Sequence, residues 1–167
     1  MTLVFDSVRS RLERLTTAMD VAHGLLAVEI PAAALAETVQ ALKVDFQFDM
    51  LLDVTAVDWP QREARFDVVW HFYSTQHKVR VRVKTHVTES EPVVESLTRL
   101  YGAAAFLERE CHEMYGIRFA GNADLRPILL YEGFTGYPLR KDYPKLGEQP
   151  LVKYREGFDP SDRLRGS

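Results

Sequence analysis

The sequence lacks several features that would identify a function directly. Its 167 residues include one cysteine, Cys111, which excludes an internal disulfide and cannot supply the four ligands of an iron–sulfur cluster. The formal net charge of −3 gives no strong positive field, so binding to nucleic acid is not expected. No apolar run is long enough for a membrane span, because Glu29 interrupts the longest one, "LLAVEIPAAALA". No glycine-rich turn of the dinucleotide-binding type opens a helix.

What the sequence does have is the composition of a globular chain, with 46% hydrophobic and 27% charged residues. Its length suits about one domain. Charged side chains near the start of the chain occupy positions where a signal peptide needs apolar ones. Seven of the nine glycines and five of the eight prolines lie at or after Gly116. We therefore expect a compact domain over residues 1–116, followed by an extended Gly/Pro-rich tail over 117–167 that wraps neighbouring proteins.

Hydrophobic periodicity predicts the elements of the compact domain. Apolar residues on one helical face predict a helix over 3–19, and Pro31 suits the first turn of a helix over 32–44. Strict alternation predicts a β-hairpin over 65–74 and 77–87. Further strands are expected at 25–30 and 50–59, and further helices at 92–102 and 106–116. The expected fold class is α+β, a two-layer domain with helices packed on a mixed or antiparallel sheet.

A row of basic residues follows the second strand of the predicted hairpin. Its members alternate with apolar residues: Lys78, Arg80, Arg82, Lys84 and His86. Such a row is most often a solvated outer face, which also discourages edge-to-edge pairing of strands. It could instead meet an acidic partner or an anionic lipid surface. No aromatic residues are interleaved on that face, which disfavours nucleic acid.

The stretch "FLERECHEMYGIRF", residues 106–119, gathers groups that can ionise or bind metal in six consecutive positions: Glu108, Arg109, Glu110, Cys111, His112 and Glu113. On a helix these side chains do not converge. Glu108 and Glu110 are two residues apart and point to opposite flanks, and "HEMYG" lacks the second histidine of a zinc-protease helix. Cys111 falls on the apolar stripe, where it suits a small buried side chain better than a nucleophile. Local geometry therefore argues against a catalytic or metal site.

The acids of this helix instead predict ion pairs. Glu108 and Glu110 flank the apolar stripe, and a carboxylate near the interior is costly unless it is paired. The partners could come from another protein or from the predicted tail, which offers Arg118, Arg126, Arg140 and Lys141. Ordinary intramolecular pairs are an equally good interpretation at this point. Arg109 and Glu113, four residues apart, are expected to pair on an exposed face, so that Glu113 should matter less than Glu110.

Residues 108–144, "ERECHEMYGIRFAGNADLRPILLYEGFTGYPLRKDYP", closely resemble the hallmark region of the C-subunit family of NADH-quinone oxidoreductase, respiratory complex I. The likeness extends over roughly residues 25–150. The matching positions are Glu108-Arg109-Glu110, Glu113, Tyr115-Gly116-Ile117, Phe119, Gly121, Asp124-Leu125-Arg126, Gly133-Phe134, Gly136 and Pro138-Leu139-Arg140-Lys141-Asp142. Three positions depart from the family pattern: Asn122-Ala123 replaces His-Pro, Tyr137 replaces His, and Glu113 stands where Asp is commoner.

The resemblance implies a hydrophilic-arm structural and assembly subunit of a proton-translocating NADH:quinone oxidoreductase, inactive as an isolated chain. It implies no catalytic, cofactor-binding or metal residues in this chain, with FMN, iron–sulfur clusters and quinone on other subunits. The implied partners are chiefly the D-type subunit, which contributes to the quinone site, and then the iron–sulfur subunits of the B and I types. The implied location is the cytoplasmic side of the bacterial plasma membrane, without a membrane span. Candidate interface residues are Glu108, Arg109, Glu110, Glu113, Arg126, Arg140, Lys141 and Asp142.

Two other functions are compatible with parts of the sequence. The equivalent subunit of a related membrane-bound hydrogenase or ferredoxin-linked complex would share the motif of residues 108–144. A stand-alone metal enzyme using Glu108, Cys111 and His112 is disfavoured by the spacings described above.

Overall fold

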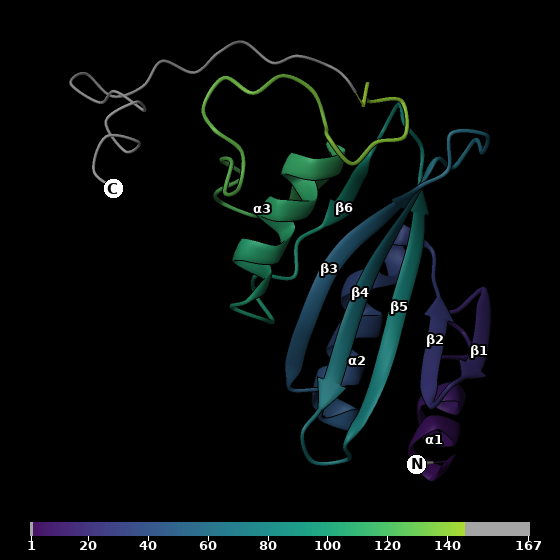
Figure 1. Ribbon diagram of the computed structural model, residues 1–167. Helices are drawn as coiled ribbons and strands as arrows, with labels where there is room; N and C mark the ends of the chain where they lie inside the picture. The colour runs from purple at the N-terminus through teal and green to yellow at the C-terminus, as the bar shows by residue number, and fades with distance from the viewer. Residues whose placement is uncertain (1, 146–167) are drawn as a thin grey trace, which may run out of the picture.

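A mixed five-stranded sheet lies at the centre of the domain in the computed structural model, which describes residues 2–145 (Figure 1). The strands run in the order β1-β2-β5-β4-β3, with β2 and β5 parallel and the other neighbours antiparallel. Their bounds are Ala18–Ala22 (β1), Leu25–Glu29 (β2), Met50–Asp58 (β3), Phe66–Ser74 (β4) and Val79–Val87 (β5). The α+β class and the predicted hairpin are confirmed. Residues 146–167 of the expected tail lie outside the described part.

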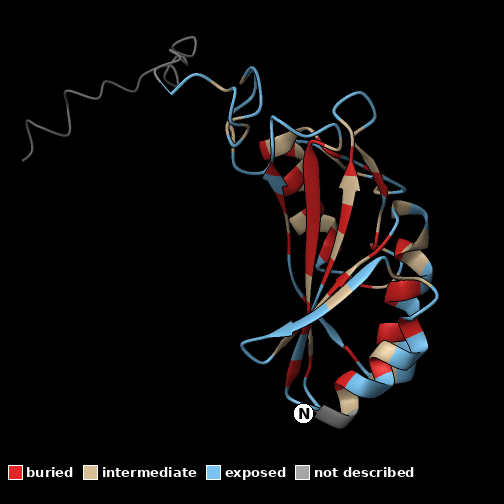
Figure 2. Ribbon diagram, turned by 90° about the vertical axis from the view of Figure 1, so that its right-hand side faces the viewer, coloured by how far each residue is buried: buried red, intermediate tan, exposed pale blue. Residues whose placement is uncertain are grey.

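Helices cover only one face of this sheet. The helices α1 (Thr2–Leu12) and α2 (Leu35–Phe46), with a short 3-10 turn η1 (Ala32–Ala34), lie together on that face, and Figure 2 shows the opposite face without a helix over it. A third helix, α3 (Ala104–Tyr115), lies beside the edge strand β3 (Figure 1). The chain after α3 forms a short strand and then an irregular segment that arches past the end of α3.

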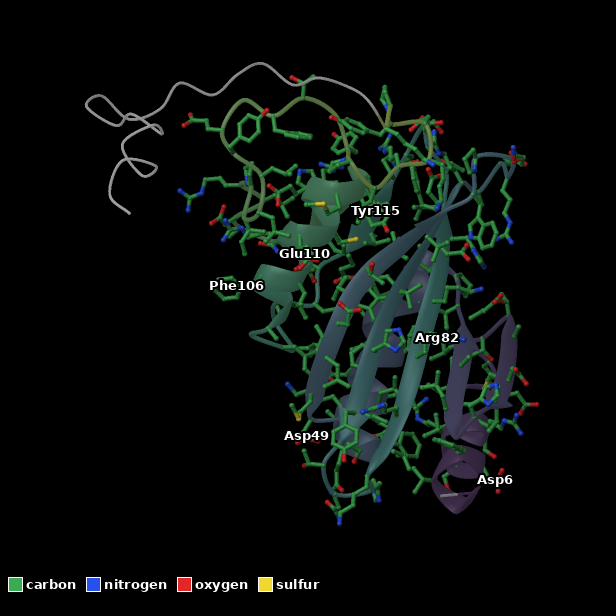
Figure 3. The ribbon with its side chains drawn as sticks, viewed as in Figure 1. Asp6, Asp49, Arg82, Phe106, Glu110 and Tyr115 are labelled. Carbon is green, nitrogen blue, oxygen red and sulfur yellow. The ribbon has the colours of Figure 1, made fainter. Side chains whose placement is uncertain are left out.

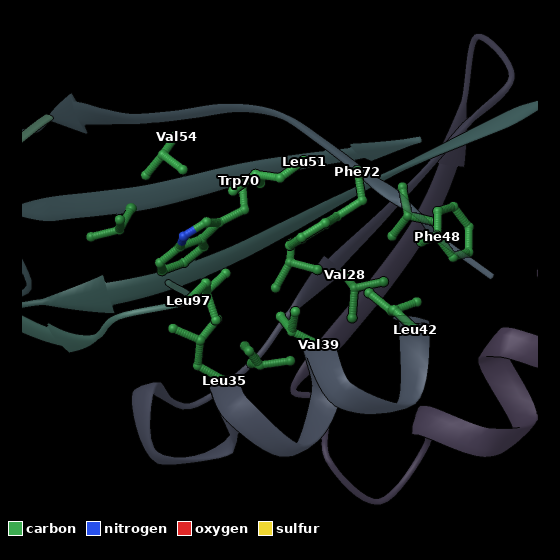
Figure 4. Close-up of a cluster of buried hydrophobic side chains, with 14 of the residues drawn as sticks. Val28, Leu35, Val39, Leu42, Phe48, Leu51, Val54, Trp70, Phe72 and Leu97 are labelled. Carbon is green, nitrogen blue, oxygen red and sulfur yellow. The ribbon is translucent and has the colours of Figure 1, made fainter. Parts of the chain in front are cut away.

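The core fills the space between the sheet and α2. Leu35, Val39 and Leu42 lie on one stripe of α2 and face Trp70 and Phe72 of β4 (Figure 4). All five side chains are fully buried, and each such burial contributes about 1.5–3 kcal/mol. The spacing of four and three residues along α2 and of two along β4 brings these side chains to the same layer. The helical period of α2 and the two-residue period of β4 therefore place these side chains in one buried layer.

The first helix is shorter than the periodicity predicted. We expected it to reach residue 19, but it ends at Leu12, and residues 18–22 form β1 instead. The turn between β1 and β2 consists of His23 and Gly24, both at positive φ (52° and 75°), which matches the twist of a tight hairpin. Pairing with β2 thus overrides the helical spacing at the end of this segment.

The predicted helix over residues 92–102 is also wrong. Residues 93–95 form the strand β6 (Val93–Glu95), which pairs in parallel with β7 (Arg118–Ala120) just after α3. Hydroxyl side chains compete with helix formation here, because Ser96 accepts a hydrogen bond from the Thr98 amide at 3.2 Å. The Leu97 amide is satisfied outside any helix by the Glu108 carboxylate at 2.7 Å. Local polar bonds and the β6–β7 pairing therefore replace the helix.

Candidate interface on helix α3 and the segment that follows it

Helix α3 ends in a turn that only glycine fits well. Gly116 has a φ of 79°, and its amide donates to the His112 carbonyl at 2.7 Å. A Cβ at this position would lie 2.6 Å from both the Tyr137 ring and the Arg140 guanidinium. The turn therefore allows residues 137–140 to pack directly against the end of α3.

Glu108 is fully buried and is held by neutral groups rather than by a cation. Its carboxylate accepts hydrogen bonds from the Leu97 amide (2.7 Å), the Ser96 hydroxyl (2.7 Å) and the Asn122 side-chain amide (2.9 Å). Burial raises the pKa of Glu108, and these three hydrogen bonds oppose that rise. The expected ion pair is therefore wrong. The carboxylate joins β6, α3 and the chain beyond β7 through donors.

Glu113 organises the next part of the chain in the same way. It is buried, and its two carboxylate oxygens accept hydrogen bonds from three successive amides, those of Ile128 (3.2 Å), Leu129 (2.9 Å) and Leu130 (2.6 Å). The expected exposed pair with Arg109 is not formed. Sequence spacing placed Glu113 on the solvent side of α3, but the segment after β7 covers that side.

Arg109 secures the residues just before these three amides. Its guanidinium donates to the carbonyls of Arg126 (2.9 Å) and Pro127 (3.0 Å) and pairs more weakly with Asp124 (3.8 Å). Arg126 itself is exposed and pairs with Asp124 at 2.8 Å. The hydrogen-bonded Arg126 guanidinium lowers the pKa of Asp124 well below its usual range. Arg109 and Glu113 thus bind backbone groups of one loop from the same helix.

Glu110 differs from its two acidic neighbours. It is exposed, and within residues 2–145 it makes no hydrogen bond or ion pair. Phe106, one turn earlier on α3, is 61% exposed (Figure 3). No partner for Glu110 comes from the described part of this chain, so the expectation that it pairs with a group of another protein stays a prediction. Its side of α3 faces outward.

A second polar cluster, which sequence reasoning missed, holds the end of the described chain. Arg65 is buried and forms a two-pronged bond with Asp58 (2.7 and 2.9 Å), together with ion pairs to Glu89 (2.7 Å) and Asp142 (2.9 Å). The Lys141 amide donates to Asp58 at 2.7 Å. The hydrogen-bonded guanidinium holds the pKa of Asp58 below its usual value. We call Asp58, Arg65, Glu89 and Asp142 the Arg65 cluster.

The sequence contains an indirect signal for one pair of this cluster, Asp58 and Arg65. Asp58 ends β3 and Arg65 directly precedes β4, so the antiparallel pairing of these strands places the two residues side by side. Glu89 and Asp142 carry no such local signal, because only the tertiary fold brings them to Arg65.

Arg140 connects the Arg65 cluster to the end of α3. Its side chain donates to the Tyr115 carbonyl at 2.7 Å and lies over the rings of Tyr137 (4.4 Å) and Phe66 (4.9 Å). It also approaches Glu89 at 3.5 Å. Of the predicted interface residues, Arg140, Lys141 and Asp142 therefore bind this chain's own core.

The loop held by these contacts presents apolar side chains to the outside. We call this set the loop surface; its exposed fractions lie between 36% and 63%, and its members are Ile128, Leu129, Tyr131, Tyr137 and Leu139. A cavity of about 150 Å³ lies between the loop and α3. Apolar side chains that gather on one exposed, internally fixed loop are typical of a protein-binding surface rather than of a solvated one.

Within residues 2–145, no group of three His, Cys, Asp or Glu residues could hold a metal ion. Cys111 is buried, and that burial raises the pKa of its thiol well above the usual value, which leaves the group in its unreactive form. The same part of the chain contains no helix that is both long and apolar enough to cross a membrane. The polar side chains of α3 described above bind and position neighbouring backbone groups.

Comparison with known proteins gives consistent results. The family described as "Respiratory-chain NADH dehydrogenase, 30 Kd subunit" matches residues 28–149. The C subunit of NADH-quinone oxidoreductase from Ruegeria sp. (strain TM1040) is 43% identical over 139 residues, which are 82% of this chain and 68% of the relative. The protein of the same name from Paramagnetospirillum magneticum is 46% identical over 126 residues, 74% of this chain and 63% of the relative.

Two solved structures are similar to the chain. The trypsin-resistant fragment of Nqo5 aligns with a TM-score of 0.65 at 29% identity, covering 75% of this chain and 100% of the fragment. A chain from the membrane-bound sulfane sulfur reductase, an archaeal respiratory membrane complex, aligns with a TM-score of 0.77 at 20% identity, covering 95% and 98%. The second similarity is one of fold alone.

Proposed function

The chain belongs to the family of the 30 kDa subunit of respiratory-chain NADH dehydrogenase, and from this premise we propose that it is a structural and assembly subunit of an NADH:quinone oxidoreductase. In this role the chain binds other subunits of the hydrophilic arm and performs no chemistry itself. FMN, iron–sulfur clusters and quinone belong to those other subunits. The assembled complex translocates protons, and this chain lies peripherally on the cytoplasmic side of the bacterial plasma membrane.

The loop surface is the observation that carries this proposal. Glu113 satisfies three successive amides and Arg109 two carbonyls, so we propose that the loop with its exposed apolar side chains is already formed before any partner binds. A preorganised apolar surface loses little conformational entropy on binding. Leu129, with 63% of its side chain exposed, has no packing role within residues 2–145 that would explain its placement.

We propose that this surface docks on the D-type subunit and that the neighbouring B and I types complete the contact. Residues 117–167 act as the connecting segment in this arrangement. The described part, 117–145, is anchored near its end by Lys141 and Asp142, which bind Asp58 and Arg65. The alternative of a hydrogenase-type complex is not favoured, because the relatives at 43% and 46% identity are NADH-quinone oxidoreductase subunits.

A matched pair of substitutions tests the proposal. Leu129 and Val44 are equally exposed, each at 63%, but Val44 lies on α2 on the helix-covered side of the sheet. We expect Leu129→Asp to reduce the content of assembled complex and NADH-driven quinone reduction in membranes together, because a buried carboxylate is costly at an interface. Val44→Asp should change neither. Normal complex with Leu129→Asp would contradict the loop surface as the docking site.

A further inference from the structure

The face of the sheet that no helix covers has a basin in its centre. The basin has a volume of about 310 Å³ and includes side chains from four strands, among them Ala27, Thr55, Val57, Val69 and Arg82. Small apolar side chains form its floor, and charged groups surround them. This is the arrangement of a protein interface, in which an apolar centre is bordered by polar groups.

Most charges around the basin are already paired with one another. Lys84 lies 2.5 Å from Glu29 and 3.6 Å from Asp67, and His86 contacts Asp67 at 2.6 Å. Arg62 approaches Asp67 at 3.5 Å from the loop before β4. Lys84 and His86 of the basic row on β5 thus have acidic partners within the chain, so an ordinary outer face of the sheet explains that part of the row.

Two opposite charges on the same face have no such partner. Arg82 is exposed, and within residues 2–145 it forms no hydrogen bond or ion pair; the same holds for Asp53 on β3. The pairing register aligns Asp53, His71 and Arg82 across three adjacent strands. Two strand spacings separate the acid from the base by about 10 Å. Burial is the main cause of the lowered pKa of His71, which leaves a neutral ring between the two charges.

We propose that this basin binds a segment of a partner protein that carries a carboxylate opposite Arg82 and a basic side chain opposite Asp53. The charge pattern favours this occupant because a lipid surface or a free anion would satisfy Arg82 and be repelled by Asp53. A partner with both signs, set about two strand spacings apart, satisfies both. Small apolar side chains of the same segment cover the exposed Val57.

The basin is separate from the loop surface. The inference rests on the proposed function in one respect: the partner is expected among the other subunits of the complex. Tyr115 at the end of α3 lies next to the basin, because it interacts with Thr55, which lines the basin.

The first test uses a photo-crosslinking amino acid in the full chain, assembled in membranes. Val57 lines the basin and is 39% exposed, and Val44 on the helix-covered side is the control position. We expect a crosslinker at Val57 to join this chain to another subunit, and one at Val44 to give at least about fivefold less product. Products that contain only lipid, only a second copy of this chain, or nothing at all would each overturn the proposal.

The second test reverses charge. We expect Arg82→Glu to lower the content of assembled complex by about tenfold after a high-salt wash, because it places like charges together. Arg82→Lys should restore most of that content, and Arg14→Glu, an exposed position beyond α1, should have no effect. Thermal unfolding of the purified chain should be unchanged by Arg82→Glu. Retention equal to that of Arg14→Glu would overturn the proposal.

These outcomes separate this inference from the proposed function. If the unmodified chain does not copurify with the complex at all, the proposed function fails. If it copurifies while Val57 and Arg82 behave as their controls do, only the basin proposal fails.

Discussion

The segment after α3 is fixed at its two ends by opposite kinds of chemistry. At its start, the carboxylates of Glu108 and Glu113 are buried and accept hydrogen bonds from neutral donors. At its end, the Arg65 cluster joins a buried guanidinium to three carboxylates. Both solutions remove charges from water, but the first uses neutral hydrogen-bond donors and the second uses charge pairing. A buried acid on a helix therefore does not imply a cation beside it.

The two regions also differ in which groups lose their partner when one side chain is removed. Removing the cation from the Arg65 cluster leaves buried Asp58 without its charge partner, whereas removing a carboxylate from α3 leaves only neutral donors without an acceptor, which costs less than an unpaired charge. We therefore expect the Arg65 cluster to be the more sensitive of the two regions.

The largest expected effect is that of Arg65→Ala. Breaking a buried ion pair by removing one partner costs about 3–5 kcal/mol, and Asp58 is 4% exposed. Arg62→Ala is the control, because about half of the Arg62 side chain is exposed and its longer pair with Asp67 (3.5 Å) should contribute about 0–1 kcal/mol. Urea unfolding of both purified variants gives the two free energies. Equal losses would show that burial does not distinguish them.

A smaller loss is expected for Glu108→Ala. Three donors lose their acceptor in a buried place, which should lower the free energy of unfolding by about 3 kcal/mol. Glu108→Gln keeps one oxygen for the Leu97 amide and should cost clearly less. If the Gln variant were the more damaging of the two, the carboxylate would need its charge, and neutral donors would not be enough to explain its burial.

For Glu113→Gln we expect a loss of about 1–2 kcal/mol, because an amide group replaces one of the two accepting oxygens. The matched control is Glu110→Gln on the same helix, where an exposed position should change stability by less than about 0.5 kcal/mol. Thermal or urea unfolding of the isolated chain measures both. The reverse order would support the interpretation from sequence spacing, in which Glu110 matters more.

The dependence of stability on pH should have opposite signs in the two regions. The pKa of Asp58 is lowered from 3.8, so its contribution is present above pH 3.8 and is lost as the pH falls through the folded value. The pKa of Glu108 is raised from 4.5, so its contribution is present below pH 4.5 and is lost as the pH rises through the folded value. Urea unfolding from pH 3 to 7 of wild type and Glu108→Gln should show the Gln variant gaining relative stability above pH 4.5. Parallel curves would contradict the raised pKa.

Much of the sheet and its core could be predicted from the sequence. Alternation in β4 and β5 predicted both strands, and Pro31 at the first turn of residues 32–44 predicted the helix α2. Both patterns follow from local geometry alone. The family resemblance selected the region around α3 as the candidate interface. It could do so because the motif is a continuous run of residues in the sequence.

The contacts of that region could not be predicted. Helical spacing placed Glu113 on a solvent face because nothing local indicates that residues 128–130 return to cover it. Glu108 was expected to need a cation, since the donors that satisfy it come from Ser96, Leu97 and Asn122 on other segments. Tertiary folding brings these hydrogen-bond partners together, and the hydrophobic periodicity of a single segment contains no information about them.

The central claim is that the loop surface is already formed in the isolated chain. Hydrogen exchange of the Ile128, Leu129 and Leu130 amides tests it most directly, since their acceptor is the Glu113 carboxylate. We predict that these amides are protected in the purified wild-type chain, that Glu113→Gln reduces their protection, and that Glu110→Gln does not. Exchange at the rate of an unfolded chain in the wild-type protein would show that the loop is ordered only by its partners, and would contradict this claim.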